Sequence, residues 1–455
     1  MFMRKSLLLL VAALSALTAS AEGGGRWTRH RQAGEPTVYI ISVKETDTIW
    51  SNNPALAASQ SMMQRNAAAK SAIADHRAAI RPGFKSLSEP SVIFANNRNS
   101  FSFAVGGYVD LRVGYGFNST IDNIDVVPYD IPVKGGYATK QELQMDATTS
   151  RVYFRGLANT KSVGKVEIFF DVDFRGGSRG SYMPRLRSGY VSMLGLTVGR
   201  DVTTFCDLQA SPTTIDFEGP NAYNYNFATV LRYEYSFLQD HLRFGVAAEL
   251  PKASGTYGET LAPIPQRVPD FPIYFQYAWG ANRDSHIRAS AVLRNIYLHN
   301  SARNTNTDLF GWGVQFSGTI RVVRFLRLFM NGVYGEGITP YIQDLTGSGL
   351  DFTPNPADPT KVQTMPMYGW QAAAQINIMP NLFISGGYST VTVCKKNGVF
   401  TEDQYKQGQY VFGNVFYNIT PRLRVAAEYL WANRKNMNDL EGSANRVNVM
   451  VRYSF

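Results

Sequence analysis

From residue 101 to the end of the chain, apolar residues alternate with polar or small residues. In the stretch Phe103–Val113, almost every odd-numbered position is Phe, Val or Leu. Alternation at period two predicts β-strands with one apolar and one polar face. We predict about sixteen such strands, over residues 102–115, 148–157, 162–174, 182–193, 195–203, 225–236, 241–251, 271–280, 285–297, 309–321, 325–335, 368–379, 382–394, 408–418, 422–433 and 444–455.

The connections between these segments alternate in length. Short joins such as Leu194-Gly195 alternate with long loops such as 204–224 and 336–367, and one join, near Val322-Val323, lacks a turn residue. Short turns at one end and long loops at the other are typical of a transmembrane β-barrel whose short turns face the periplasm. An even number of strands would place both ends of such a barrel in the periplasm.

Alternation alone also fits a soluble β-protein, but three features favour a membrane barrel. Aromatic residues such as Trp279, Trp312 and Trp431 lie toward the ends of apolar faces, as in an interfacial girdle. The polar faces carry more arginines than a dry core would hold. The last strand ends in Phe455 and resembles the sorting signal of bacterial outer-membrane barrels. We predict an all-β fold, a transmembrane antiparallel β-barrel over 102–455, with secreted soluble β-repeats as the alternative.

The first 21 residues have the features of a secretory signal peptide. Arg4 and Lys5 precede the apolar run Leu7–Leu17, and Ala19-Ser20-Ala21 fits a small-residue cleavage site. The apolar run is too short to span a membrane, so we interpret residues 1–21 as a cleaved signal. Export and the barrel pattern together predict localisation in the cell outer membrane.

Residues 22–101 are predicted to form a periplasmic N-terminal segment. Positions 54–80 are rich in Ala, Gln, Met and Arg, which favour helices, and Pro82-Gly83 can end a helix there. A short periplasmic helix at about 54–80 is the prediction. It either associates with a second copy or lies on the surface as part of a linker.

Composition narrows the class further. Mean hydropathy is −0.19, and no stretch after residue 21 approaches the roughly 20 apolar residues of a spanning helix. Aromatic residues make up 13%, too many for a disordered chain. Cys206 and Cys394 are the only cysteines, which excludes a disulfide scaffold but leaves their pairing open. The net charge of +10 has no compact basic cluster and does not indicate nucleic acid.

Arginines recur on the polar faces of the predicted strands, where acidic residues are fewer. A low-dielectric wall lined mainly with one sign of charge concentrates the opposite ion, and the guanidinium group matches carboxylate geometry. We therefore predict an anion-preferring pore. The alternative is that these arginines pair with inward acids and only stiffen the wall. The candidate pore-lining and solute-binding residues are Arg185, Arg187, Arg232, Arg243, Arg288, Arg294, Arg424 and Arg452.

The loop 204–224 is the candidate constriction. It carries Asp207, Asp216 and Glu218. If it folds into the lumen, its acids would face the arginines of the wall across a narrow opening that limits solute size. The alternative is an ordinary external loop.

Five stretches within residues 102–240 carry a resemblance to a known family: Gly106–Leu111, Ser150–Phe154, Arg185–Tyr190, Leu196–Asp207 and Thr214–Pro220. They resemble the DcaP-like trimeric outer-membrane porins of Gram-negative bacteria. The resemblance implies a sixteen-stranded barrel, a homotrimer, uptake of small anionic solutes such as dicarboxylates, and a constriction loop at Thr214–Pro220.

Other chemistries find little support. Gly176–Gly180 matches G-x-S-x-G, but a strand and not a helix is predicted after it, so we interpret it as a turn. The five histidines show no metal-ligand spacing, and no nucleotide-binding fingerprint occurs, so neither a metal nor a cofactor is predicted. We predict a non-enzymatic porin for passive diffusion, with outer-membrane lipid and small anionic solutes as partners. A non-conducting structural or adhesin barrel and an outer-membrane hydrolase are the alternatives.

Overall fold

The computed structural model divides the chain into two units, 1–37 and 38–455, and the residues it describes all lie in the second. The signal peptide expected at 1–21 and the first part of the expected helix, 54–66, therefore lie outside the described residues. The described residues are 38–42, 49–51, 67–80, 92–96, 100–118, 121, 124–134, 141–178, 180–280, 283–355, 358–396 and 401–455.

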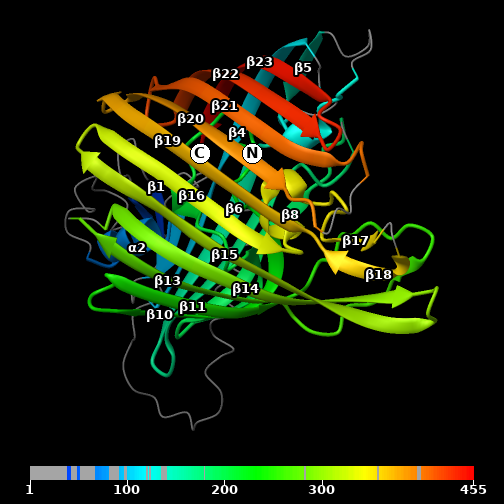
Figure 1. The fold of residues 1–455 in the computed structure, drawn as a ribbon. Helices are drawn as coiled ribbons and strands as arrows, with labels where there is room; N and C mark the ends of the chain where they lie inside the picture. Colours follow the sequence, from blue (N-terminus) through cyan, green and yellow to red (C-terminus); the bar gives the residue numbers. More distant parts are fainter. Residues whose placement is uncertain are drawn as a thin grey trace. The chain divides into compact units, whose positions relative to one another are not determined.

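Antiparallel strands run side by side around one closed barrel (Figure 1). The first barrel strand, β4, pairs with β6 on one edge and with the last strand, β23, on the other, where Leu111 lies opposite Val451. This pairing closes the sheet, so the barrel has no free edge of the kind that would leave backbone groups unpaired in lipid. The sixteen barrel strands are β4 Phe101–Asn118, β6 Arg151–Thr160, β7 Gly164–Asp173, β8 Arg185–Met193, β9 Leu196–Val202, β10 Phe227–Phe237, β11 Leu242–Glu249, β13 Phe271–Trp279, β14 Ser285–Asn300, β15 Thr305–Val323, β16 Leu326–Glu336, β19 Pro366–Met379, β20 Leu382–Val393, β21 Tyr405–Asn418, β22 Leu423–Asn436 and β23 Glu441–Ser454.

Each of the sixteen predicted segments corresponds to one of these strands, so the predicted barrel is confirmed. The join near Val322-Val323 is a turn two residues later, at Arg324-Phe325. Strands β14 and β15 extend further than predicted, because their pairing continues to Asn300 opposite Thr305. At the tight turn between β8 and β9, Leu194 and Gly195 both have positive φ, as a two-residue type I′ hairpin requires.

The two faces of each strand differ in exposure as the alternation predicts. On β15, Val314 and Phe316 are about half exposed, whereas the side chains of Gln315 and Ser317 are buried. Neighbouring strands place further apolar side chains at the same level on the outside, such as Phe275 of β13 and Tyr334 of β16. The outer surface is therefore an apolar band suited to lipid, and the polar faces turn inward.

Short elements extend the barrel at the end that carries the long loops. Strand β5 (Glu142–Asp146) adds to β4 beyond the end of β6, and β12 (Leu261–Pro263) adds to β14. A separate hairpin consists of β17 (Phe352–Asn355) and β18 (Asp358–Thr364). Within the described parts of the loops lie the 3-10 turns η2 Pro128–Asp130, η4 Leu208–Ala210, η5 Thr339–Tyr341 and η6 Gln343–Leu345.

At the end with the short turns, an N-terminal sheet continues the barrel wall. Strand β3 (Val92–Asn96) pairs with β4 beyond the last residue of β23, and β1 (Val38–Ser42) pairs with both β3 and β2 (Ile49–Ser51). This extension belongs to the same sheet as the barrel.

Helix α2 (Ala67–Ala78) lies within the predicted range 54–80. It packs inward onto its own chain: Ile73 is buried, and His76 Nε2 lies 3.0 Å from Ser102 Oγ on the inner face of β4. Asp75 forms an ion pair of 3.2 Å with Lys165 of β7. Among the described residues, no helix is both long and apolar enough to cross a membrane.

An apolar core lies inside the barrel, and residues of two long loops form much of it. Phe205 and Ala222 of loop 204–224 pack with Ile338, Tyr341 and Leu345 of loop 337–365. The rings of Phe205 and Tyr341 meet edge to face, with centroids 5.3 Å apart. The two loops therefore support each other within the lumen.

Candidate functional site in the barrel lumen

Loop 204–224 folds into the lumen. Its backbone bonds with inward-facing side chains on several strands: Gln315 Nε2 donates to the Phe205 carbonyl at 3.1 Å, and Gln371 Nε2 donates to that of Ala210 at 3.0 Å. The Ala222 N–H donates to Ser389 Oγ at 2.9 Å. Because these partners come from β15, β19 and β20, the loop follows the inner wall and is not an external loop.

Buried carboxylates fix the loop near its start and near its middle. Asp207 Oδ2 accepts from Ser317 Oγ at 2.7 Å and lies 2.8 Å from His286 Nε2. Burial alone would raise the pKa of Asp207, but these two partners and the nearby Arg288 outweigh it and lower the pKa to about 2. Asp207 is therefore ionised at neutral pH and anchors the loop to β14 and β15.

The second anchor is Glu428 on β22. Its carboxylate accepts from the N–H groups of Ile215 and Asp216 at 2.9 and 2.8 Å. The Asp216 carboxylate in turn accepts from Tyr410 Oη at 2.9 Å and from the Val126 N–H at 3.2 Å. Asp216 thus ties the loop to β21 and to the loop between β4 and β5.

Seven arginines on β4, β6, β8, β23 and the start of the β7–β8 loop form one cluster, which we call the arginine array. In the ion pairs that join them, they face five carboxylates, and three of these carboxylates each face two guanidiniums. The members are Arg112 and Arg452 on Asp110, Arg151 and Arg187 on Asp171, Arg185 and Arg187 on Asp173, Arg155 on Glu167, and Arg175 on Asp125.

A cavity of about 310 Å³ lies where the array meets the loops. Arg175, Arg185 and Arg187 line its basic side. Asp125, Asp130, Glu218 and Asp344 contribute carboxyl groups to the same lining, together with the rings of Phe217 and Tyr225. Arg175 and Arg185 also line a second cavity of about 450 Å³ beside β5. The site therefore combines opposite charges across a confined space.

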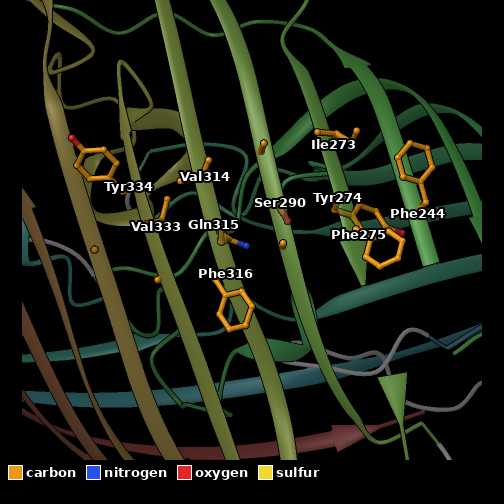
Figure 2. A pocket seen from close by; sticks show the side chains of 14 residues that line it. Phe244, Ile273, Tyr274, Phe275, Ser290, Val314, Gln315, Phe316, Val333 and Tyr334 are labelled. Atoms are coloured by element: carbon orange, nitrogen blue, oxygen red, sulfur yellow. The ribbon is translucent and has the colours of Figure 1, made fainter. Parts of the chain in front are cut away.

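A larger cavity, of about 710 Å³, lies elsewhere (Figure 2). Phe244, Phe275, Phe316 and Tyr334 are among the residues that border it, and most of its lining is apolar. Because the Phe275, Phe316 and Tyr334 side chains are about half exposed on the outside of the barrel, we assign this hollow to the lipid-facing surface and not to the solute path.

The predicted site residues do not all come together. Arg185, Arg187 and Glu218 line the 310 Å³ cavity, whereas Asp207 and Asp216 serve as loop anchors. The remaining arginines are spread over the inner wall. Three of them form ion pairs: Arg232 with Asp201, Arg294 with Asp270 and Asp351, and Arg452 with Asp110. Arg288 stacks over Tyr274 and donates to the Thr204 carbonyl. Arg424 donates to Asn418, and the exposed Arg243 donates to Ser236.

Four arginines of the array and one aromatic residue were not among the predicted site residues. Arg151 and Arg155 alternate with the outward Val152 and Phe154, so the strand pattern contains the signal for them. The remaining three are Arg112, Arg175 and Phe217. Arg175 and Phe217 lie in loops, where alternation does not indicate which way a side chain points.

Cys206 and Cys394 are both free thiols, so they do not pair with each other.

Comparisons with known proteins agree with the barrel. A family model described as the porin subfamily matches residues 103–452. The structure is similar to the crystal structure of the outer membrane channel DcaP of Acinetobacter baumannii, with a TM-score of 0.68 and 19% identity over 78% of this chain and 98% of that one. It is also similar to Salmonella typhi OmpF, with a TM-score of 0.50 and 14% identity over 79% of this chain and 99% of that one. A search of curated protein sequences gave no match. Since the family match spans well over half of the sequence, the chain belongs to the porin subfamily and is an outer-membrane channel.

Proposed function

We propose that this channel admits small hydrophilic solutes by passive diffusion and prefers anions, in particular carboxylates. The observation that carries the proposal is the arginine array, in which Asp110, Asp171 and Asp173 each face two guanidiniums. In these pairs, positive charge exceeds negative charge. A low-dielectric lumen focuses such an excess, which raises the local concentration of anions.

Arg185 is the array member best placed to contact a solute. It binds Asp173 through two nitrogens, at 2.9 and 2.6 Å, yet its side chain stays 40% exposed. A guanidinium has five N–H donors in a planar fork, so N–H groups of Arg185 beyond the two used for Asp173 can donate to a passing carboxylate.

Arg187 has a supporting position beside it. Its side chain is 1% exposed, and it bonds Asp173 and the Tyr225 hydroxyl. It contributes charge to the cavity without presenting its donors to water. Glu218 lines the same cavity, and the opposed charges would orient a dipolar solute as it passes.

The proposal includes the surroundings of the barrel. We propose that residues 22–101 lie in the periplasm, that outer-membrane lipid contacts the apolar band, and that the channel is a homotrimer, as the resemblance to DcaP-like porins implies. Tyr182 and Met183, in the loop before β8, are more than half exposed, and contact with another copy would cover them. Crosslinking in native membranes, read as the mass of the resulting adduct, tests the trimer.

We further propose that the protein has no catalytic activity of its own. The Gly176–Gly180 stretch leads into strand β8 and not into the helix that a nucleophile elbow needs. A structural or adhesin barrel stays the second candidate, because the two loops packed inside the lumen narrow the passage.

The deciding experiment is planar-bilayer recording of the purified protein under a tenfold KCl gradient. We expect discrete conductance steps and a reversal potential on the chloride side. A reversal potential at zero or on the potassium side would contradict the anion preference. Absence of steps from protein that keeps its barrel fold would favour the adhesin, and esterase or peptidase turnover would favour the hydrolase.

A further inference from the structure

Phe217 lies at the point where loop 204–224 meets the arginine array. Its side chain is buried, and three guanidinium carbons lie close to its ring centroid: Arg175 at 4.7 Å, Arg187 at 5.1 Å and Arg112 at 5.3 Å. All three distances are within the range of cation–π attraction. One loop residue therefore contacts arginines from β4, from β8 and from the loop between β7 and β8.

The arrangement addresses an electrostatic problem. Guanidiniums gathered around one point repel one another. Arg112 pairs with Asp110 and Arg175 pairs with Asp125, whereas Arg187 pairs with both Asp171 and Asp173 and donates to the Tyr225 hydroxyl. These partners differ from one arginine to the next, but the Phe217 ring contacts all three. The negative face of an aromatic ring attracts cations and fills space without adding a charge. The Phe217 ring thus holds positive side chains together while preserving their net charge.

Hydrogen bonds that do not involve the ring hold the loop on both sides of Phe217. Residues 215 and 216 are held by Glu428 through their N–H groups, and Ala222 is held by Ser389. None of these bonds involves the Phe217 side chain. A change of the ring should therefore alter the arginines more than the course of the loop.

We propose that Phe217 is a positioning residue that sets the channel's selectivity by fixing the guanidiniums of Arg112, Arg175 and Arg187 at the constriction. This inference rests on the proposed anion preference, and it assigns that preference to a loop residue that carries no charge. Loss of the ring removes the contact that the three guanidiniums share, so they move apart and the positive potential at this point falls.

The test compares Phe217→Leu, which removes the π face at similar size, with Phe217→Tyr, which keeps it. Phe205→Leu is the matched control, since it removes a buried ring of the same loop that packs on Tyr341. Reversal potential under a KCl gradient and single-channel conductance are measured for each. We expect Phe217→Leu to lower the chloride-to-potassium permeability ratio about two- to fivefold, and Phe217→Tyr and Phe205→Leu to keep the wild-type ratio.

A merely structural role of the ring predicts a different result, namely altered conductance with an unchanged permeability ratio. That result overturns the inference, as does a loss of selectivity in Phe217→Tyr equal to that in Phe217→Leu. Should Phe217→Leu fail to form a heat-modifiable barrel, Phe217→Met takes its place under the same criteria. A wild-type channel without chloride preference would contradict the proposed function itself, whereas a selective wild type with an equally selective Phe217→Leu contradicts this inference alone.

Discussion

The Tyr405 hydroxyl donates a hydrogen bond of 2.5 Å to the buried carboxylate of Asp344. The same carboxylate accepts from the Tyr129 N–H at 2.9 Å and from Asn221 Nδ2 at 3.1 Å. The Asp344 side chain therefore joins the loop that carries η6 to three other parts of the chain. These are the loop between β4 and β5, loop 204–224 and the start of β21. Asp344 is thus a hub that joins these loops.

Stability of this hub should depend on pH. Burial raises the pKa of Asp344 to about 6, an effect that the hydrogen bonds from Tyr405, Tyr129 and Asn221 partly offset. Because the folded pKa lies above the ordinary value, the folded loops favour the neutral carboxyl. The loops should lose stability as pH rises from about 4 through 6, by up to about 3 kcal/mol. The neighbouring charge of Asp130 also raises the pKa of Asp344. Asp130 and Arg434 both lie close enough to Tyr129 to act on its hydroxyl electrostatically.

The measurement compares thermal unfolding of the wild type with that of Asp344→Asn at pH 5 and pH 7. An amide cannot ionise, so the variant should gain stability relative to the wild type at pH 7 and keep only about half of that advantage at pH 5. An equal difference between the two proteins at both pH values would contradict the assignment to Asp344.

Anion preference should weaken when Arg185 loses its charge. Arg185→Gln keeps a polar side chain at the cavity but removes one positive charge that is 40% exposed. We expect the reversal potential under a KCl gradient to move toward zero. Arg243→Gln is the control, because Arg243 is also exposed on an inner face but bonds Ser236 near the short turns. Equal shifts in both variants would show that net charge, and not this position, determines selectivity.

The barrel could be predicted because alternation is a local property of each strand. Val314 and Gln315 are neighbours in the chain, and their apolar and polar natures alone assign them to opposite faces. The lengths of β14 and β15 were underestimated, because their outer ends, such as Asn300 opposite Thr305, are held by pairing in polar segments where alternation fades.

The site was only partly predictable, because it depends on register and on loop paths. Arg185 and Arg187 share a face by their spacing, which is why they were identified together. The register of β9 and β10 places Arg232 opposite Thr197, and the Arg232 side chain reaches along the strand to Asp201, which lies opposite Ala228; no local pattern indicates this pair. The contact of Phe217 with the arginines depends on the path of loop 204–224 and carries no sequence signal of its own.

Removal of the Asp207 anchor should widen the channel. Asp207→Ala leaves the His286 imidazole and the Ser317 hydroxyl without their buried partner, which costs about 1–3 kcal/mol. We expect a lower unfolding temperature and larger single-channel conductance, since the first half of loop 204–224 is released from β14 and β15. Asp439→Asn is the control, because Asp439 is a surface carboxylate paired only with Lys406 and Lys435 in the ion pairs of the described residues. Unchanged conductance in Asp207→Ala would contradict the anchoring role.

The apolar band on the outside of the barrel predicts a position-dependent penalty for charge. Val314 is 46% exposed and borders the outer hollow beside Phe316 and Tyr334 (Figure 2). An arginine at the middle of the hydrocarbon layer destabilises a β-barrel by about 2–4 kcal/mol, but near the interface by about 1 kcal/mol or less. Val314→Arg should therefore lower the free energy of unfolding in lipid bilayers, measured by urea titration. The loss should be far larger than that caused by Asn306→Arg, which lies on the same strand near its first residue, Thr305. A barrel whose outer face were covered by protein or water would not distinguish the two positions in this way, so equal penalties would contradict the assignment of this face to lipid.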